Sequence, residues 1–161
     1  MFLLDTSSGV GRENFDKMKV FMKNIISSFD IDNQMTRVGI LTYDVDARID
    51  IKLSDYNNKA ALFERIDRLP YYSGELTRID RALMMVSNTA FSEENGGRKD
   101  RNKVLNLLKY TFLINQHTNL IFSEYARFNF HDQVNLLFSK NCLWTKFYFL
   151  FGDTRQLVYE I

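Results

Sequence analysis

The sequence predicts an α/β fold, a doubly wound and mostly parallel sheet flanked by helices, and two observations lead to it. Short apolar segments typical of buried strands alternate with longer segments whose apolar residues recur at helical spacing. A loop of polar turn residues follows the first strand segment directly. The 161 residues are enough for one domain with a modest core. In such a fold, ligands bind at the carboxyl ends of the strands.

The first predicted elements are the clearest ones. Residues 2–4 are an apolar strand segment that ends at the polar loop 5–9. From Phe15 to Phe29, apolar residues recur along one side of an amphipathic helix. Residues 37–43 are apolar and β-branched, as in a buried parallel strand. Residues 48–53 alternate between polar and apolar, which places that strand at a sheet edge.

The later elements become less clear along the chain. Leucine and isoleucine spacing predicts a second helix over residues 62–69, which Pro70 ends, and a third helix over 79–90. Residues 104–108 read as another buried strand. We therefore expect one domain over residues 1–108. Residues 109–161 form an unassigned aromatic-rich tail, in which segments 136–138 and 147–151 fit either strands or buried helix turns.

Three oxygen-bearing side chains are candidate metal ligands. Asp5 and Ser7 lie just past the first strand, and Thr77 lies at the start of the third helix. In a doubly wound sheet both loops open on the same edge. Mg²⁺ prefers a near-octahedral shell of oxygens and keeps several waters. A carboxylate and two hydroxyls supply part of that shell for Mg²⁺ or Mn²⁺, and an Asp or Glu carboxylate from a protein ligand would complete it.

The order of these segments resembles a von Willebrand factor type A domain over about residues 2–108. Five segments carry the resemblance. They look like the family's first strand and metal loop, its second strand, the two parts of its threonine segment and the loop before its fourth strand: Phe2–Phe15, Thr36–Tyr43, Ile66–Tyr71, Gly74–Leu83 and Phe91–Arg98. It implies a Rossmann-like α/β fold. It also implies a non-enzymatic protein-binding module of the adhesion or extracellular-matrix type, with a metal-ion-dependent adhesion site (MIDAS).

The resemblance also identifies where this chain departs from the family. The family's site has the pattern Asp-x-Ser-x-Ser, a threonine, and an aspartate after the fourth strand. Asp5, Ser7 and Thr77 match three of these positions, but Gly9 stands at the third position of the loop, with Ser8 as a stand-in. Lys109-Tyr110-Thr111 occupies the place of the last aspartate, and the family's later strands and helices are not recognisable after it. We therefore expect a degenerate, weak site and a fold that is incomplete at its C-terminal side.

Other interpretations of the same loop remain open. Asp-Thr-Ser before a helix is, as an isolated motif, more often a helix N-cap than a metal loop. Gly9-Val10-Gly11 suggests a dinucleotide loop, but Asn14 stands where the third glycine belongs, so a nucleotide-binding enzyme is less favoured. The main alternative is a metal-independent interaction fragment or a non-functional truncated product.

Composition limits the partners further. The net charge of +1 gives no reason to expect nucleic acid as a partner, and no apolar run approaches the ~18 residues that a membrane span needs. Cys142 is the single cysteine, and His117 and His131 belong to no metal-binding pattern. The apolar start before Asp5 is too short for a signal peptide, whereas the family resemblance implies an extracellular location.

Overall fold

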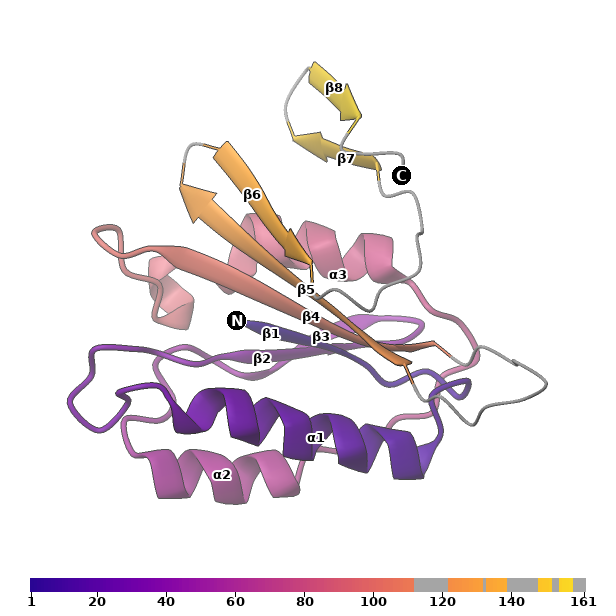
Figure 1. The fold of residues 1–161 in the computed structure, drawn as a ribbon, viewed down its shortest axis with the longest axis horizontal. Coiled ribbons are helices and arrows are strands. Elements are labelled where there is room, and N and C mark those ends of the chain that lie inside the picture. The colour runs from indigo at the N-terminus through magenta and orange to yellow at the C-terminus, as the bar shows by residue number, and fades with distance from the viewer. Residues whose placement is uncertain (112–121, 132, 139–147, 152–153, 158–161) are drawn as a thin grey trace.

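The computed structural model describes residues 1–111, 122–131, 133–138, 148–151 and 154–157, with side chains up to residue 108 (Figure 1). The elements follow one another as β1 Phe2–Asp5, α1 Arg12–Ser27, β2 Ile40–Tyr43, β3 Ala47–Ile51, α2 Lys59–Asp67, α3 Ile79–Met85, the π-helical turn η1 Val86–Ala90, the 3₁₀ turn η2 Glu93–Asn95, β4 Lys103–Thr111, β5 Phe122–His131, β6 Gln133–Phe138, β7 Tyr148–Phe151 and β8 Thr154–Leu157. The predicted alternation of strands and helices is confirmed up to β4.

A six-stranded sheet forms the centre of the molecule, with the strand order β3-β2-β1-β4-β5-β6. β1 lies between β2 and β4 and is parallel to both, whereas β3 pairs antiparallel with β2 at the edge. The predicted parallel centre and edge strand are therefore confirmed. Asp5 lies opposite Tyr43, and Leu4 lies opposite both Thr42 and Leu108. Because of this register, the carboxyl ends of β1 and β2 lie level with each other.

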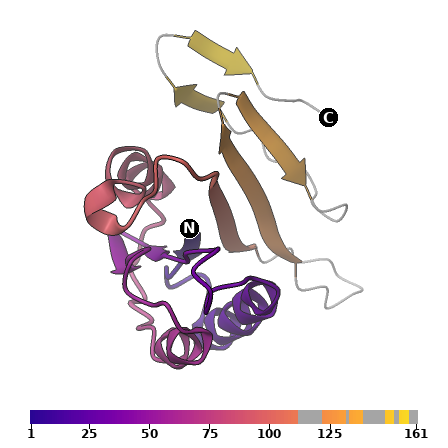
Figure 2. The same ribbon diagram turned by 90° about the vertical axis from the view of Figure 1, so that its left-hand side faces the viewer.

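Helices cover both faces of the sheet, as Figures 1 and 2 show: α1 and α2 lie on one side and α3 on the other. Alternation along β1 sends Phe2 and Leu4 into the core beneath α1 and α2, and Leu3 into the core beneath α3. Each large apolar side chain buried in this way stabilises the fold by roughly 1.5–3 kcal/mol. Burial on both faces is the reason that β1 reads as continuously apolar.

The helix boundaries differ slightly from the expected ones. α2 begins one turn earlier because the Asn58 side chain accepts a hydrogen bond from the Ala61 amide at 2.9 Å, and it ends at Asp67, before Pro70. The third predicted helix, 79–90, is divided into α3 and the wider turn η1. None of the helices in the described residues is long and apolar enough to cross a bilayer.

Beyond β4 the described chain continues as strands. β4 pairs antiparallel with β5, and β5 with β6, while β7 and β8 form a separate two-stranded sheet. Of the two interpretations of segments 136–138 and 147–151, the strand is correct for 136–138 and 148–151; Phe147 lies outside the described residues. The proposed boundary between residues 108 and 109 falls within β4. His117 and Cys142 also lie outside the described residues, and His131 ends β5.

Candidate functional site

Two loops lie side by side at the carboxyl end of β1. One loop, residues 6–11, leads from β1 to α1, and the other, residues 68–78, leads from α2 to α3. Ser7 and Gly74 pair as an isolated parallel bridge, and the Ser8 amide donates a hydrogen bond to the Gly74 carbonyl at 2.8 Å. Both loops therefore open on the same edge of the sheet, next to the last residue of β1.

Asp5 and Ser7 are held together by a local backbone contact. Oδ1 of Asp5 accepts a hydrogen bond from the Ser7 amide at 2.9 Å, and the two residues are only 2% and 5% exposed. This contact is an Asx turn, in which an aspartate bonds the backbone two residues further on. A buried carboxylate is costly unless it is hydrogen-bonded. The turn thus fixes the orientation of the Asp5 carboxylate at the edge of the sheet.

The N-cap interpretation of Asp5-Thr6-Ser7 is wrong. α1 begins at Arg12, and its N-cap is Gly11, with no side-chain capping hydrogen bond. Gly11 has a φ of 75°, a backbone conformation that favours glycine, so the chain turns into the helix there. The polar loop ends several residues before the helix and leaves Asp5 and Ser7 at the end of β1.

Tyr71 joins the two loops and was not identified from the sequence. Its hydroxyl donates to the Ser7 carbonyl at 2.8 Å and accepts from the Gly11 amide at 3.0 Å. Its ring lies 5.4 Å from the ring of Phe15 on α1, and the Arg12 guanidinium lies 5.7 Å from its centroid. The tyrosine therefore connects the candidate metal loop to the core beneath α1. An aromatic residue directly after Pro70 was the only sequence signal for this role.

Asp44 is a second residue that the sequence analysis missed. It follows β2 directly and is 2% exposed, with Oδ1 accepting from Arg48 Nη2 at 2.9 Å and from the Asp46 amide at 3.1 Å. Its carbonyl accepts from the Arg78 amide at 2.7 Å. A Cβ built on Gly74 would lie 2.7 Å from Cγ and Oδ2 of Asp44. The buried Asp44 thus packs directly against the second loop. Only glycine at position 74 allows the loop backbone to approach the Asp44 side chain this closely.

The remaining predicted ligand positions lie around the two loops. Thr77 is exposed and directly precedes Arg78, whose backbone is bonded to Asp44. Ser8 and Gly9 are exposed at the tip of the first loop, and a Cβ on Gly9 would meet no atom within 4 Å. The bridge at Gly74 brings the segment that carries Thr77 beside the first loop.

Lys109 stands where the family has its last aspartate, and it lies in a strand rather than in a loop. β4 runs without interruption through Lys109 to Thr111, and Lys109 lies opposite Glu124 of β5. The place where the resemblance expects an aspartate is therefore part of a strand. Where the structure describes the chain, no three Asp, Glu, His or Cys side chains gather as a metal-binding group. A ligand set at this edge would consist of Asp5 together with hydroxyl oxygens.

Arginines pair with the acidic side chains near Thr77. The Arg78 guanidinium donates to both carboxylate oxygens of Asp80, from Nε at 2.9 Å and from Nη2 at 2.6 Å. This hydrogen-bonded pair lowers the pKa of Asp80 from 3.8 to about 2. Arg81 forms an ion pair with Asp46. Both acids are therefore compensated by an arginine at the start of α3.

Comparison with known proteins agrees with this architecture. The chain is 34% identical to the collagen alpha-6(VI) chain of Mus musculus over 108 residues, which are 67% of this chain and 5% of the relative. It is 30% identical to matrilin-3 of Gallus gallus over 99 residues, 61% of this chain and 22% of that protein. The chain therefore spans only a small part of the length of these relatives.

Solved structures share the fold. Proximal thread matrix protein 1 from the mussel byssus superposes with a TM-score of 0.62 at 25% identity, over 66% of this chain and 28% of that one. A further structure of the same mussel protein, described as having a zinc-occupied MIDAS motif, has a TM-score of 0.58 at 23% identity and covers 62% of this chain and 27% of its own. The family model of the von Willebrand factor type A domain matches residues 1–109. The chain belongs to the von Willebrand factor type A domain family.

Proposed function

We propose that the chain is a non-enzymatic protein-binding module of the adhesion or extracellular-matrix type. Residues 1–108 would carry this function, with Asp5, Ser7 and Thr77 holding Mg²⁺ or Mn²⁺ weakly. The observation that carries the proposal is the bridge between Ser7 and Gly74, because it lays the two loops with the candidate ligands side by side at one edge of the sheet. The relatives are extracellular matrix proteins, which supports an extracellular location.

The described residues fit part of a cation site. Asp5 offers a carboxylate that is already oriented by the Ser7 amide, so little ordering is needed when a cation binds. Ser7 and Thr77 offer hydroxyl oxygens, and Mg²⁺ accepts such ligands together with water. The bound cation would supply a positive charge for an Asp or Glu carboxylate of a protein ligand. This chain's own part in binding is to present the ion at the end of β1.

The same residues explain why the site is expected to be weak. Gly9 lacks the hydroxyl of the third loop position, and the exposed Ser8 is the remaining stand-in. Lys109 lies within β4, in the place of the last acidic ligand. Mg²⁺ requires a nearly complete octahedral oxygen shell, so each missing ligand has to be replaced by water. We therefore expect a dissociation constant well above about 1 μM.

Calorimetric titration with Mg²⁺ and Mn²⁺ tests this site. Thr77→Val removes one hydroxyl and keeps the branched shape, and it should weaken cation binding about tenfold or more. The matched control is Thr89→Val, because Thr89 is also exposed but lies on η1, outside both loops. Asp5→Asn should abolish binding. Equal effects of the two threonine substitutions would contradict the assignment, and sub-micromolar affinity would contradict the predicted weakness.

The alternative is a metal-independent interaction fragment, and the strand conformation at Lys109 favours it. In that case the protein unfolds in one cooperative thermal transition whose midpoint is the same in excess Mg²⁺ and in EDTA. A cation that binds the folded state raises the midpoint instead. A chain without any cooperative transition would be a non-functional truncated product, and both proposals would then fail.

A further inference from the structure

A cavity lies at the opposite edge of the sheet, where β1, β2 and β4 begin. Its volume is about 340 Å³, and its lining includes Phe2 of β1, Val38 just before β2, and Lys103 and Val104 at the start of β4. Ligand pockets in proteins span roughly 300–1,000 Å³. Asp5 is the last residue of β1, so the candidate metal site lies at the other end of the same strand. The cavity is therefore a separate feature of the molecule.

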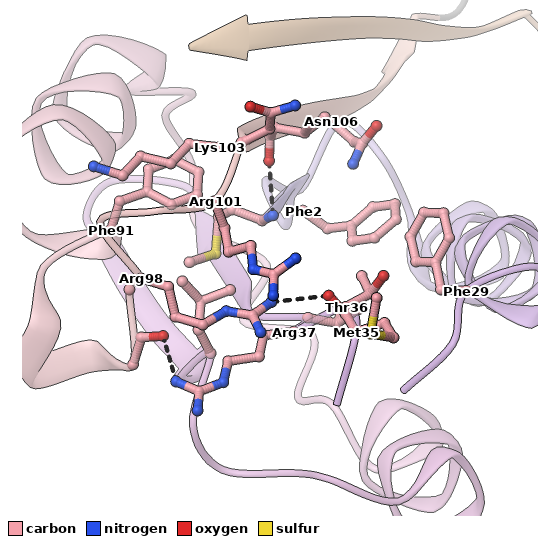
Figure 3. Close-up of a pocket in the computed structure, with 17 residues that line it drawn as sticks. Phe2, Phe29, Met35, Thr36, Arg37, Phe91, Arg98, Arg101, Lys103 and Asn106 are labelled. Atoms are coloured by element: carbon pink, nitrogen blue, oxygen red, sulfur yellow. Dashed lines mark hydrogen bonds between the residues drawn. The ribbon is translucent and has the colours of Figure 1, made fainter. Parts of the chain in front are cut away.

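Positive charge is concentrated around this cavity. Four basic residues are part of its lining, Arg37, Arg98, Arg101 and Lys103, and none of the described residues that line it is Asp or Glu. Figure 3 shows the three guanidinium groups gathered on one side of the cavity. The whole chain has 21 basic and 20 acidic residues, so this cluster does not reflect a generally basic protein. Such a patch attracts anions.

The basic groups repel one another. Burial, together with the positive charges of Arg37 and Arg101, lowers the pKa of Arg98. The acidic neighbour at the rim is Asp100, whose carboxylate lies 3.5 Å from Nε of Arg101. An oxyanion placed among the guanidinium groups would relieve this repulsion and would accept charge-assisted hydrogen bonds.

Two of the arginines are already fixed in position. Arg37 Nη1 donates to the Gly96 carbonyl at 2.9 Å, and Arg98 donates from Nη1 to the Gln34 carbonyl and from Nη2 to the Met35 carbonyl, both at 2.9 Å. These bonds hold together the loops that precede β2 and β4. A guanidinium has five N–H donors, so both groups keep donors for a ligand. A preorganised donor loses little conformational freedom on binding.

Holding the loops together does not account for the other two basic residues. Within the described part of the chain, Arg101 pairs with its neighbour Asp100, and no contact assigns Lys103 Nζ to either loop. Arg101 adds to the repulsion that lowers the pKa of Arg98 without fastening either loop. Lys103 lines the cavity as well, but Figure 3 shows its side chain pointing away from the guanidinium groups. A bound anion gives Arg101 a role that loop packing does not.

Much of the remaining lining is apolar. Phe2, Val38 and Leu53 belong to the buried core and form part of the lining. The half-buried Phe29 and Phe91 also line the cavity, and Figure 3 shows them on opposite sides of it. Apolar surface next to a few convergent polar groups is the usual composition of a small-molecule site. We propose that this cavity binds a small amphiphilic oxyanion, in which a sulfate, phosphate or carboxylate group is attached to an aromatic or aliphatic body.

Titration of the full 161-residue protein with phenyl sulfate, followed by NMR or calorimetry, tests this proposal. Inorganic sulfate carries the charge without the apolar body, and benzyl alcohol carries the ring without the charge. Phenyl sulfate should bind about tenfold tighter than either probe, because both halves of the cavity then contribute. The affinity should fall with added salt and remain unchanged in EDTA, which separates this site from the proposed cation site.

Substitutions locate the binding in the cavity. Arg101→Gln should weaken phenyl sulfate binding about tenfold, the effect of losing one charge-assisted contact. Lys103→Gln should have a smaller effect, because its side chain points away from the guanidinium groups in Figure 3. Arg68→Gln is the matched control, because Arg68 is exposed, lies at the end of α2 and pairs with Glu64. Thermal melts establish that each variant folds. Equal losses in the cavity and control variants, equal binding of phenyl sulfate and benzyl alcohol, or no saturable binding would each overturn the proposal.

Discussion

Replacing Gly74 by alanine tests how the second loop rests on Asp44. The added methyl group would lie 2.7 Å from Cγ and Oδ2 of the aspartate. Carbon atoms in favourable contact are about 3.5–4.0 Å apart, so the two groups have to separate by about 1 Å. Asp44 cannot retreat easily, because the residue is 2% exposed and its carboxylate is bonded to Arg48 and to the Asp46 amide. The substitution therefore moves either the half-buried ion pair of Asp44 and Arg48 or the loop itself.

The expected cost follows from this geometry. Overpacking of a buried site destabilises proteins by about 1–3 kcal/mol. For a protein in which the free energy of unfolding falls by about 2 kcal/mol per molar urea, a loss of 2 kcal/mol lowers the unfolding midpoint by about 1 M. If the loop moves instead, the bonds from Ser8 to Gly74 and from Arg78 to Asp44 lengthen. Cation binding at Asp5 should then weaken as well.

Gly9→Ala provides the matched control for this experiment. A Cβ at Gly9 meets nothing within 4 Å, so the same chemical change is made without a steric contact. Its free energy of unfolding should stay unchanged or rise by up to about 1 kcal/mol, because alanine restricts the unfolded chain. Urea unfolding followed by circular dichroism measures both variants. Equal midpoints for Gly74→Ala and Gly9→Ala would refute the argument that Asp44 blocks this position.

Three further outcomes are expected. Tyr71→Phe removes the hydroxyl that joins Ser7 to Gly11 and should lower the free energy of unfolding by about 1–2 kcal/mol in urea; an unchanged midpoint would mean that water replaces both contacts. Gly9→Ser supplies the missing hydroxyl in open space and should raise Mg²⁺ affinity by calorimetry, and no gain would argue against the loop as a ligand. Because the pKa of Asp80 is lowered from 3.8 to about 2 in the folded state, the folded protein binds its proton less readily than the unfolded chain. The advantage in thermal midpoint over Asp80→Asn should therefore be constant above about pH 4 and disappear as the pH falls toward 2, whereas a constant difference at all pH values would contradict the ion pair.

Local patterns predicted the parts of the fold that depend on burial. The apolar residues of β1 and the helical spacing from Phe15 onward are direct consequences of a sheet covered on both faces. The same patterns did not determine the secondary structure of segments 136–138 and 147–151, because short apolar runs fit either a strand or a buried helix turn. β4 extends further than expected because Lys109–Thr111 continue its pairing with β5, which a strand pattern based on apolar residues does not reveal.

The candidate site was predictable only in part. Asp5 and Ser7 are marked by their place after a strand, and Thr77 by the family resemblance. Tyr71 was missed because its hydroxyl reaches a carbonyl 64 positions away in the sequence. The carboxylate of Asp44 is bonded locally, to Asp46 and Arg48, but its contacts with the second loop, at Gly74 and Arg78, join segments that are far apart in the chain. No local spacing encodes such a contact. The start of α1 after Gly11 was not predicted for another reason. It depends on the positive φ angle of Gly11, a backbone property, and not on a capping side chain.

The position of β1 has a consequence for how the chain reaches this fold. Phe2 pairs with Ile40 on one side and with Asn106 on the other, so one neighbour of the strand is separated from it by about a hundred residues. β4, β5 and β6 follow one another in the sheet in chain order and need only nearby partners. Closing a long loop before its contacts form costs entropy and slows folding. The pairing of β1 with β4 is thus expected to be a late step in folding, later than the pairing of β1 with β2.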